Sequence, residues 1–457
     1  MSGLTAARRR PAVGRGKEGD TTERTRRESI RGYLRALGPG LVTGASDDDP
    51  SGIATYAQAG SSFGFGLLWT TLLTFPLMTG VQEICDRTAL ATGKGLGELA
   101  TERLTGRGRR VVLVLVGLLI VANALNIAAD LVAIGSGMQL LHAGPAAVWA
   151  VVAGVTISVL VVTGSFELVA RVFKLFCLAL FSYIAMLLVV KLDWGGVARS
   201  TFVPHLSLSS AYVALLVAVL GTTISPYLFF WQSLHRVEEM REEDEGGSRP
   251  QPLPQRERRS ALQKQRRSRF DVLSGMAFSN VVMFAIIVTT AATIGKHGRH
   301  DIQSAADAAS ALQPIAGRFA TILFALGFIG SGMLAVPVLA GAGSAGMAGL
   351  LGKSVGFSRS PRKAPIFYGL VLLGMLGGTA LSLLGVNPIQ LLVVVAVING
   401  VAAAPFLLIV MLISNDRRLM GDYVNGRLAR AVGWSTTAVM AVAAFVLFAF
   451  AHGGGLY

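Results

Sequence analysis

Residues 44–52 have the sequence GASDDDPSG, which places three consecutive carboxylates and a proline inside an otherwise apolar segment. About eleven helical residues separate Ala36 from the first aspartate, and a rise of ~1.5 Å per residue spans roughly half of a ~30 Å hydrocarbon core. We therefore expect the three acids near the bilayer midplane. Ionised groups at that depth usually line a water-accessible pathway or hold a cation.

Pro50 is expected to break the helix at this point. It removes a backbone donor, and the Gly and Ser residues beside it favour unwinding, which leaves carbonyl groups free to face a ligand. Together with the acids, the break predicts a cation site. In the alternative interpretation the segment lies at the membrane edge, where Asp48 or Asp49 caps the following helix. The small and apolar residues at 53–62 favour the midplane interpretation.

The composition is typical of a polytopic α-helical membrane protein. The chain has 457 residues, of which 52% are hydrophobic and 15% charged. A net charge of +15 could indicate nucleic-acid binding. The Lys and Arg residues lie between apolar runs, however, where they set membrane orientation, so we expect a lipid bilayer and no nucleic acid as partner. Cys85 and Cys177 have no metal-ligand spacing, and no cofactor is predicted.

Apolar runs long enough to cross a membrane occur eleven times along the chain. Basic residues concentrate in alternate connecting segments. The positive-inside rule therefore predicts a multi-pass protein of the cell (inner) membrane, with the N-terminus in the cytoplasm and the C-terminus outside. The runs lie at 36–62 (interrupted), 64–84, 111–141, 146–165, 172–190, 209–235 (interrupted), 271–294, 317–347, 365–385, 389–413 and 431–451.

The second interrupted run has its own proline, Pro226, in the sequence GTTISPY at residues 221–227. Broken helices at matching positions of two five-span halves predict an inverted-repeat secondary transporter, with its site between the breaks. A membrane channel or a membrane enzyme has no need of this pairing.

The predicted organisation has four parts. Residues 1–35 form a disordered, basic cytoplasmic tail without a signal-peptide core. Residues 36–190 form the first five-helix repeat and residues 191–413 the second, with a charged cytoplasmic loop at 236–270 that is predicted to be a solvated linker. Residues 414–457 hold the eleventh helix and the C-terminus.

Several motifs occur in order along the chain: Gly38-Pro39-Gly40, Asp49-Pro50-Ser51-Gly52, Gln82, Asp130-Leu131, Ser225-Pro226-Tyr227, Asn280 and the segment SNDRRLMG at 414–421. This arrangement resembles the Nramp family of divalent metal transporters over residues 37–421. The resemblance implies an all-α leucine-transporter fold with two inverted repeats of five helices and an added eleventh helix. It also implies that the chain imports a divalent metal into the cytoplasm by alternating access.

The candidate metal ligands depart from the family pattern at two positions. Asp49 retains the acid of the family's Asp-Pro-Gly-Asn motif, but Gly52 stands at the Asn position. Ser225 replaces the methionine of the Met-Pro-His motif, and Thr222 falls where the family offers a backbone carbonyl. With Asp48 as a further candidate ligand, this is an oxygen-only and roomier site that suits partly hydrated magnesium or manganese. It is similar to the Nramp-related magnesium transporters.

Proton coupling is predicted to be weak or absent, so protons remain an open partner. The family carries a histidine late in the sixth span and two acids in the third. Here Gln232 replaces the histidine, Asp130 is kept, and Ala133 occupies the place of the second acid. Asp130 suits a proton or ion pathway, and the alternative is a structural partner inside the helix bundle.

Other polar residues have simpler interpretations. Glu83 and Asp86 are predicted to form a solvated helix end, with a role in the exit vestibule as the alternative. His235 ends the sixth span and is a candidate for an inner gate, and Asn126 is expected to make a helix–helix hydrogen bond.

Two other function classes were weighed against metal transport. A sodium-coupled or amino-acid symporter of the same architecture is disfavoured by the three aspartates at the first break. An intramembrane hydrolase would pair Asp49 with Asp130, but no Gly-x-Gly-Asp or His-Glu-x-x-His signature accompanies them. We therefore predict that the chain is not an enzyme.

Overall fold

The computed structural model describes residues 39–163, 180–188, 190–242, 250–293, 305–384 and 388–452. These residues form helices and connecting segments, with no strand among them. The predicted tail at 1–35 and residues 172–179 and 189 of the fifth predicted span lie outside the described residues. The count of eleven spans therefore stays a prediction.

Within the described ranges, eight segments are long and apolar enough to cross a membrane, and a ninth is added if the bent pair around residues 50–92 is one span. They correspond to the predicted runs from 111–141 onward, apart from the run at 172–190. These helices are α6 (Gly106–Leu140), α7 (Ala146–Thr163), α10 (Ser210–Thr223) followed by α11 (Pro226–Glu242), α12 (Arg258–Thr293), α13 (Ala305–Leu350), α14 (Pro365–Ser382), α15 (Pro388–Ser414) and α17 (Arg427–His452).

The first interrupted run consists of two short helices. α2 (Pro39–Asp47) and α3 (Pro50–Phe63) are separated by Asp48 and Asp49, and Pro50 is the first residue of α3. Proline is favoured at this position because the first amide of a helix has no partner in any case. The break in the helix thus falls inside the triplet of aspartates.

The second interrupted run has the same construction. α10 ends at Thr223 and α11 begins at Pro226. The Ser225 hydroxyl lies 2.7 Å from the Gly221 carbonyl oxygen and 2.8 Å from the Thr222 carbonyl oxygen, so it donates to the end of α10. Carbonyls that have no intrahelical partner are satisfied in this way.

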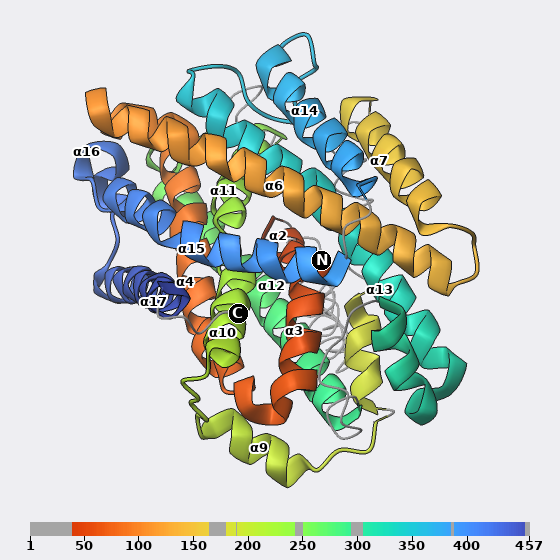
Figure 1. Ribbon diagram of the computed structural model, residues 1–457. Helices are drawn as coiled ribbons and strands as arrows, with labels where there is room; N and C mark the ends of the chain where they lie inside the picture. The colour runs from red at the N-terminus through yellow and green to blue at the C-terminus, as the bar shows by residue number, and fades with distance from the viewer. Residues whose placement is uncertain are drawn as a thin grey trace, which may run out of the picture. The chain divides into compact units, whose positions relative to one another are not determined.

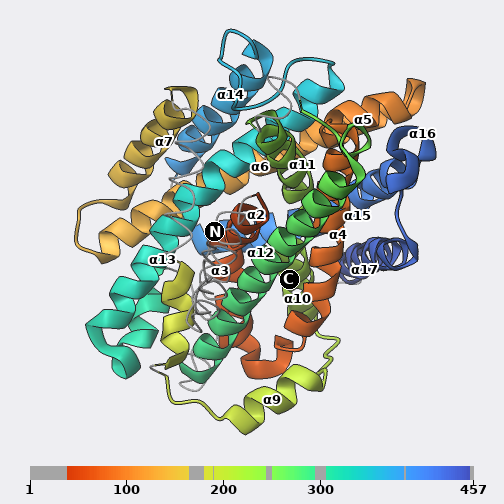
Figure 2. The ribbon, with the colours of Figure 1, turned by 180° about the vertical axis from the view of Figure 1, so that it is seen from behind.

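Glycines allow both broken helices to lie against their neighbours (Figures 1 and 2). α2 packs on α12, and a Cβ added at Gly44 would lie 2.1 Å from the Gly275 carbonyl oxygen. α10 packs on α15, where a Cβ at Gly221 would lie 2.2 Å from the Ala396 carbonyl oxygen. Only glycine permits such close backbone contact.

The second predicted span begins later than expected. A 3₁₀ turn at Gly64–Leu67 follows α3, and α4 (Thr70–Thr92) runs back at an angle of 113° to the preceding segment. Gly64 ends α3 with φ of 56°, a left-handed conformation that favours glycine. The apolar residues at 64–69 were included in the span because composition alone does not locate this turn.

The charged segment at 236–269 is largely helical, so its interpretation as a solvated linker is wrong at both ends. α11 continues to Glu242, and α12 begins at Arg258. Arg236 and Glu238 are buried. Arg236 is paired with Asp86 of α4, and Glu238 is paired with Arg241 of the same helix. Residues 243–249 lie outside the described part.

Candidate functional site

Asp49 lies where three helices meet, with a side chain that is buried from solvent. Its Oδ1 accepts hydrogen bonds from the Ser51 hydroxyl at 2.5 Å and from the Gly52 amide at 2.7 Å, both on α3. Its Oδ2 accepts from Asn126 Nδ2 of α6 at 3.3 Å and from the Tyr227 hydroxyl of α11 at 3.2 Å. The carboxylate therefore links the two broken helices to α6.

The hydrogen bond from Gly52 makes Asp49 the N-cap of α3. The capping interpretation thus describes its local contact correctly. All three aspartates are nevertheless buried, with exposed fractions of 0% for Asp47 and Asp48 and 1% for Asp49. They lie in the interior of the helix bundle and not at an exposed helix end, and burial of acids is costly without compensating partners.

Asp47 and Asp48 face a different helix from Asp49. The Ser279 hydroxyl of α12 lies 2.8 Å from Asp47 Oδ2 and 3.2 Å from Asp48 Oδ1. One hydroxyl hydrogen serves only one acceptor at a time. The other oxygen of each carboxylate, Asp47 Oδ1 and Asp48 Oδ2, has no partner among the described residues. Asp48, predicted beside Asp49 as a ligand, is thus turned toward α12.

The second break lies against the first. The Thr222 hydroxyl is 3.5 Å from the Ser51 hydroxyl. The Tyr227 hydroxyl lies 3.1 Å from the Ser46 carbonyl oxygen as well as 3.2 Å from Asp49 Oδ2, so these two oxygens share its one hydrogen. Ser225, which lies between α10 and α11, directs its hydroxyl to the carbonyls at the end of α10. Of the predicted ligand positions at the second break, Thr222 therefore lies beside Ser51 of the first break, whereas Ser225 contacts backbone.

The space beside Gly52 is limited in this structure, and a roomier site there stays a prediction. A Cβ added there would lie 3.2 Å from both the Asp47 carbonyl oxygen and the Thr222 hydroxyl, and 3.4 Å from the Tyr56 ring. Neighbouring groups have closed the space that a larger side chain would fill, because protein interiors pack densely.

Asp130 lies on α6 four residues after Asn126, so both side chains are on the same face of the helix. Asp130 is fully buried, and both of its carboxylate oxygens lack a hydrogen-bond partner among the described residues. The alternative of a structural partner inside the helix bundle therefore finds no support among the hydrogen bonds of the described residues.

Gln232 does not contact Asp130. Its Nε2 donates to Asp86 Oδ1 of α4 at 2.6 Å. Asp86 is 1% exposed and also accepts from Arg236 Nε at 2.5 Å, so the interpretation of Asp86 as a solvated helix end is wrong. The two donors, four residues apart on α11, both point toward α4. Glu83 fits the prediction better, since it is partly exposed and pairs with the buried Arg87 and the exposed Arg269.

His235, the gate candidate, is buried beside Trp231, with ring centroids 5.3 Å apart. This contact places it in a packed aromatic group next to the Arg236 ion pairs.

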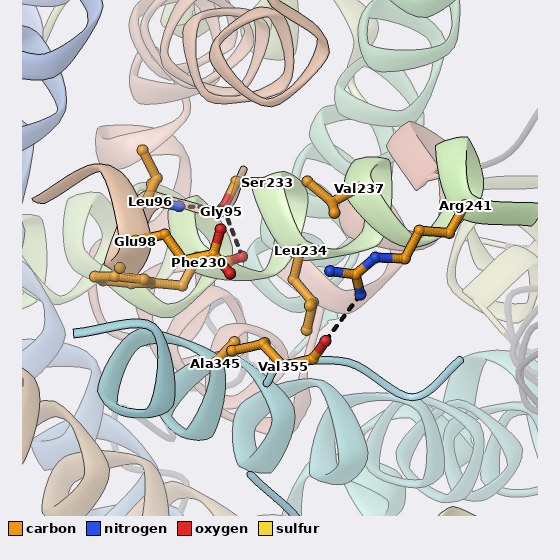
Figure 3. A pocket seen from close by; sticks show the side chains of 11 residues that line it. Gly95, Leu96, Glu98, Phe230, Ser233, Leu234, Val237, Arg241, Ala345 and Val355 are labelled. Atoms are coloured by element: carbon orange, nitrogen blue, oxygen red, sulfur yellow. Dashed lines mark hydrogen bonds between the residues drawn. The ribbon is translucent and has the colours of Figure 1, made fainter. Parts of the chain in front are cut away.

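A separate cavity, with an empty volume of about 310 Å³, opens between α5 (Leu96–Arg103), α11 and the segment after α13 (Figure 3). Glu98 and Arg241 are the charged side chains in its lining. Burial raises the pKa of the Glu98 carboxyl above its ordinary value, against the opposing effect of the Arg241 guanidinium. None of the residues that contact the Asp49 side chain lines this cavity.

The donor set around Asp49 limits the chemistry that the site can support. No three His, Cys, Asp or Glu side chains are arranged to hold a metal ion in the part of the chain that the structure describes. A cation at Asp49 would therefore be held by one carboxylate together with hydroxyl, amide and carbonyl oxygens. Such hard oxygen ligands suit magnesium or manganese.

A family model described as "Natural resistance-associated macrophage protein-like" (Nramp) matches residues 40–449. The chain belongs to the Nramp family. The resemblance inferred from the two broken spans is thus confirmed, and this Nramp chain is a multi-pass membrane protein of a family of divalent metal transporters.

Similar proteins of known name support the same assignment. The Nramp chain is 30% identical over 426 residues to the divalent metal cation transporter MntH of Ralstonia nicotianae, covering 90% of this chain and 89% of that protein. The MntH protein of Klebsiella pneumoniae is 26% identical over 411 residues, with coverage of 89% and 92%. These relatives are transporters, which confirms that the Nramp chain is not an enzyme and removes support from the hydrolase alternative.

Solved structures establish the fold. A crystal structure of the Eremococcus coleocola manganese transporter matches with a TM-score of 0.72 and 16% identity, over 97% of this chain and 91% of that one. The nucleobase-cation-symport-1 family transporter Mhp1 matches with a TM-score of 0.56 and 13% identity, over 91% of both chains. The predicted leucine-transporter-like, all-α fold class is therefore confirmed.

Proposed function

We propose that this Nramp chain imports a divalent cation, magnesium or manganese, by alternating access, and that the cation binds at Asp49 between the α2–α3 and α10–α11 breaks. One observation carries the proposal: a buried carboxylate receives hydrogen bonds from α3, α6 and α11 at once. A cation that replaces these hydrogen-bond donors at the carboxylate would therefore change the contacts of both broken helices. The relatives named as divalent metal cation transporters support the substrate class.

Oδ2 is the side of Asp49 that a cation would approach. Its hydrogen bonds from Asn126 and Tyr227, at 3.3 and 3.2 Å, are longer than the two to Oδ1, at 2.5 and 2.7 Å, and are weaker for that reason. Asn126 Oδ1 has no partner among the described residues. Rotation of the Asn126 amide would exchange its donor for this oxygen and turn Asn126 into a ligand.

The oxygen-only donor set supports magnesium as a substrate beside manganese. Sulfur ligands favour softer transition metals, and Ser225 supplies a hydroxyl at the position of the family's methionine. Magnesium keeps several of its waters and usually binds through one or two carboxylates. The small side chains of Ser51, Thr222 and Ser225 would admit such a partly hydrated ion once the breaks separate.

Weak or absent proton coupling is part of the proposal. Asp130 is a buried acid on α6, but the position of the family's histidine holds Gln232, whose amide is engaged with Asp86. Two positive charges that cross inward gain ~4.6 kcal/mol per 100 mV of inside-negative potential. Import of an abundant ion is therefore feasible without protons. The orientation with a cytoplasmic N-terminus and an outside C-terminus follows from the positive-inside rule.

The experiment is metal uptake into liposomes by the Asp49→Asn variant. Asparagine still caps a helix, so folding is expected to be retained while the anionic ligand is lost. Asp47→Asn removes the neighbouring charge, which faces α12, and serves as the matched control that keeps uptake. The proposal predicts loss of Mg²⁺ and Mn²⁺ uptake in Asp49→Asn alone. Uptake at the wild-type rate in that variant would contradict the assignment.

A further inference from the structure

A second group of buried charges surrounds Arg236, ten residues after Pro226 on α11. Arg236 is 2% exposed. Its Nε donates to Asp86 Oδ1 of α4 at 2.5 Å, and its Nη2 donates to Asp271 Oδ2 of α12 at 3.0 Å. Nη1 donates to Glu239 on α11 itself. One guanidinium is thus surrounded by three carboxylates, two of which come from other helices.

Neutral donors complete the coordination of these acids. The Ser268 hydroxyl donates to Asp86 Oδ2, and the Gly40 amide at the start of α2 donates to Asp271 Oδ2 at 2.8 Å. The group therefore joins α2, α4, α11 and α12, and α4 packs on both α11 and α12 (Figure 2). Buried carboxylates are tolerated only with such partners, because the cost of removing an ion from water is several kcal/mol.

One buried polar atom in this group lacks a hydrogen-bond partner among the described residues. Gln232 is fully buried, and its Nε2 donates to Asp86 Oδ1, yet its Oε1 has no partner among the described residues. An unsatisfied buried carbonyl oxygen beside carboxylates is costly. Arginine and the nearby hydroxyl and amide donors serve the acids and not this oxygen. A cation that takes several oxygen ligands would satisfy it.

We propose that Asp86, Asp271 and the Gln232 carbonyl oxygen form a second divalent-cation site, and that the Arg236 guanidinium occupies it as a tethered cation until α11 moves. The acids are the hard ligands that magnesium and manganese prefer. Lys264 also pairs with Glu239, at 3.2 Å, so the three carboxylates face two cations and one negative charge remains for a divalent ion. The inference rests on the proposed function, because the ions that reach this site are those released from Asp49.

The geometry of α11 connects the two sites. Tyr227, at the start of α11, donates to Asp49, while Gln232 and Arg236 further along the same helix donate to Asp86. A movement of α11 that withdraws Tyr227 from Asp49 therefore also displaces Arg236 from its acids. The predicted orientation places this second site on the cytoplasmic side of Asp49, on the way out of the protein.

The test counts bound Mn²⁺ in the purified full-length protein by electron paramagnetic resonance of the free ion. Wild-type protein is expected to bind one Mn²⁺ that requires Asp49, and a second, weaker one that requires Asp86. The double variant Arg236→Gln/Glu239→Gln removes one charge of each sign, so the formal charge of the group is unchanged. We expect the second site to bind Mn²⁺ about tenfold more tightly in it, or better.

The controls separate the two proposals. Adding Asp86→Asn to the double variant should abolish only the second site, whereas adding Asp49→Asn should abolish only the first. Retention of the Asp49-dependent ion shows that the double variant is folded. A second site of unchanged affinity would overturn the inference and leave the proposed function standing, whereas a missing Asp49-dependent ion in folded wild-type protein counts against the proposed function.

If the double variant does not fold, the wild-type titration decides alone. A weak second Mn²⁺ that is lost in Asp86→Asn supports the inference, and the absence of any second ion at millimolar Mn²⁺ overturns it.

Discussion

Ser225→Met restores the family's thioether at the second break and is expected to shift transport from magnesium toward manganese. The serine hydroxyl donates to the carbonyl oxygens of Gly221 and Thr222 at 2.7 and 2.8 Å, and the side chain is 1% exposed. Methionine removes that donor and brings a soft sulfur ligand. We expect the ratio of Mn²⁺ to Mg²⁺ uptake to rise about tenfold, which corresponds to ~1.4 kcal/mol.

The same substitution has a cost in stability that can be worked out separately. Loss of the hydroxyl removes a hydrogen bond worth about 1 kcal/mol, because its one hydrogen serves either the Gly221 or the Thr222 carbonyl. The longer side chain adds about 1–3 kcal/mol of overpacking. Ser225→Ala removes the hydroxyl without adding sulfur or bulk. Ser225→Ala should lose the stability contributed by the hydroxyl hydrogen bond but leave the ratio of Mn²⁺ to Mg²⁺ uptake unchanged.

The assay is competitive uptake of the two ions into liposomes by equal amounts of wild-type, Ser225→Ala and Ser225→Met protein. An unchanged ratio in folded Ser225→Met protein would refute the reasoning, because the ligand at this position would then not discriminate between the ions. A shift of equal size in Ser225→Ala would assign the effect to the lost hydroxyl and not to sulfur.

Three further outcomes are expected. Tyr227→Phe removes a donor that competes with the cation for Asp49. The half-saturation concentration for Mg²⁺ uptake should fall about tenfold, because a hydrogen bond to a charged group contributes ~1.5–3 kcal/mol. A rise in this concentration would indicate that the hydroxyl is itself a ligand. Gly221→Ala should prevent folding, because its Cβ would meet backbone at 2.2 Å, whereas Gly377→Ala, with nothing within 4 Å, should fold as judged by size-exclusion chromatography. Glu98→Gln should raise the melting temperature at neutral pH. Burial raises the pKa of Glu98, so the protonated side chain contributes its full stability below the ordinary pKa of 4.5, and this contribution is lost as the pH rises through the pKa of the folded protein. The gain should vanish in acid, and an equal gain at low pH would exclude this cause.

Both helix breaks were predictable from sequence because their cause is local. Pro50 and Pro226 remove an amide donor inside an apolar run wherever the chain lies, and the structure begins a helix at each of them. The family followed from the motifs around the same two prolines. The sharp turn before α4 was missed, since an apolar run does not show where it bends and Gly64 is one of many glycines.

The partners of Asp49 were not predictable in the same way. Asn126 and Tyr227 lie 77 and 178 residues from it along the chain, and only the packing of α3, α6 and α11 brings them together. A signal was present, because Asn126 stands one helical turn before Asp130, and Tyr227 follows the proline of the second break. The sequence pattern did not identify Asn126 or Tyr227 as a hydrogen-bond partner of Asp49.

The charged group around Arg236 was misread for the opposite reason. Seven acids and many basic residues in one segment are typical of a solvated linker, and that composition gave no sign of the buried ion pairs at its ends. Burial of Arg236 depends on Asp86 and Asp271, which lie 150 and 35 residues away along the chain. Such long-range pairing has no signature in a single sequence.

The most direct measurement is Mg²⁺ and Mn²⁺ uptake, side by side, by the purified protein in liposomes that carry an internal pH dye and an inside-negative potential. We expect uptake of both ions through Asp49, with magnesium entering without acidification of the interior. Uptake of manganese alone, accompanied by acidification, would contradict it, because Gly52, Ser225 and Gln232 would then be tolerated variations in a proton-coupled manganese transporter.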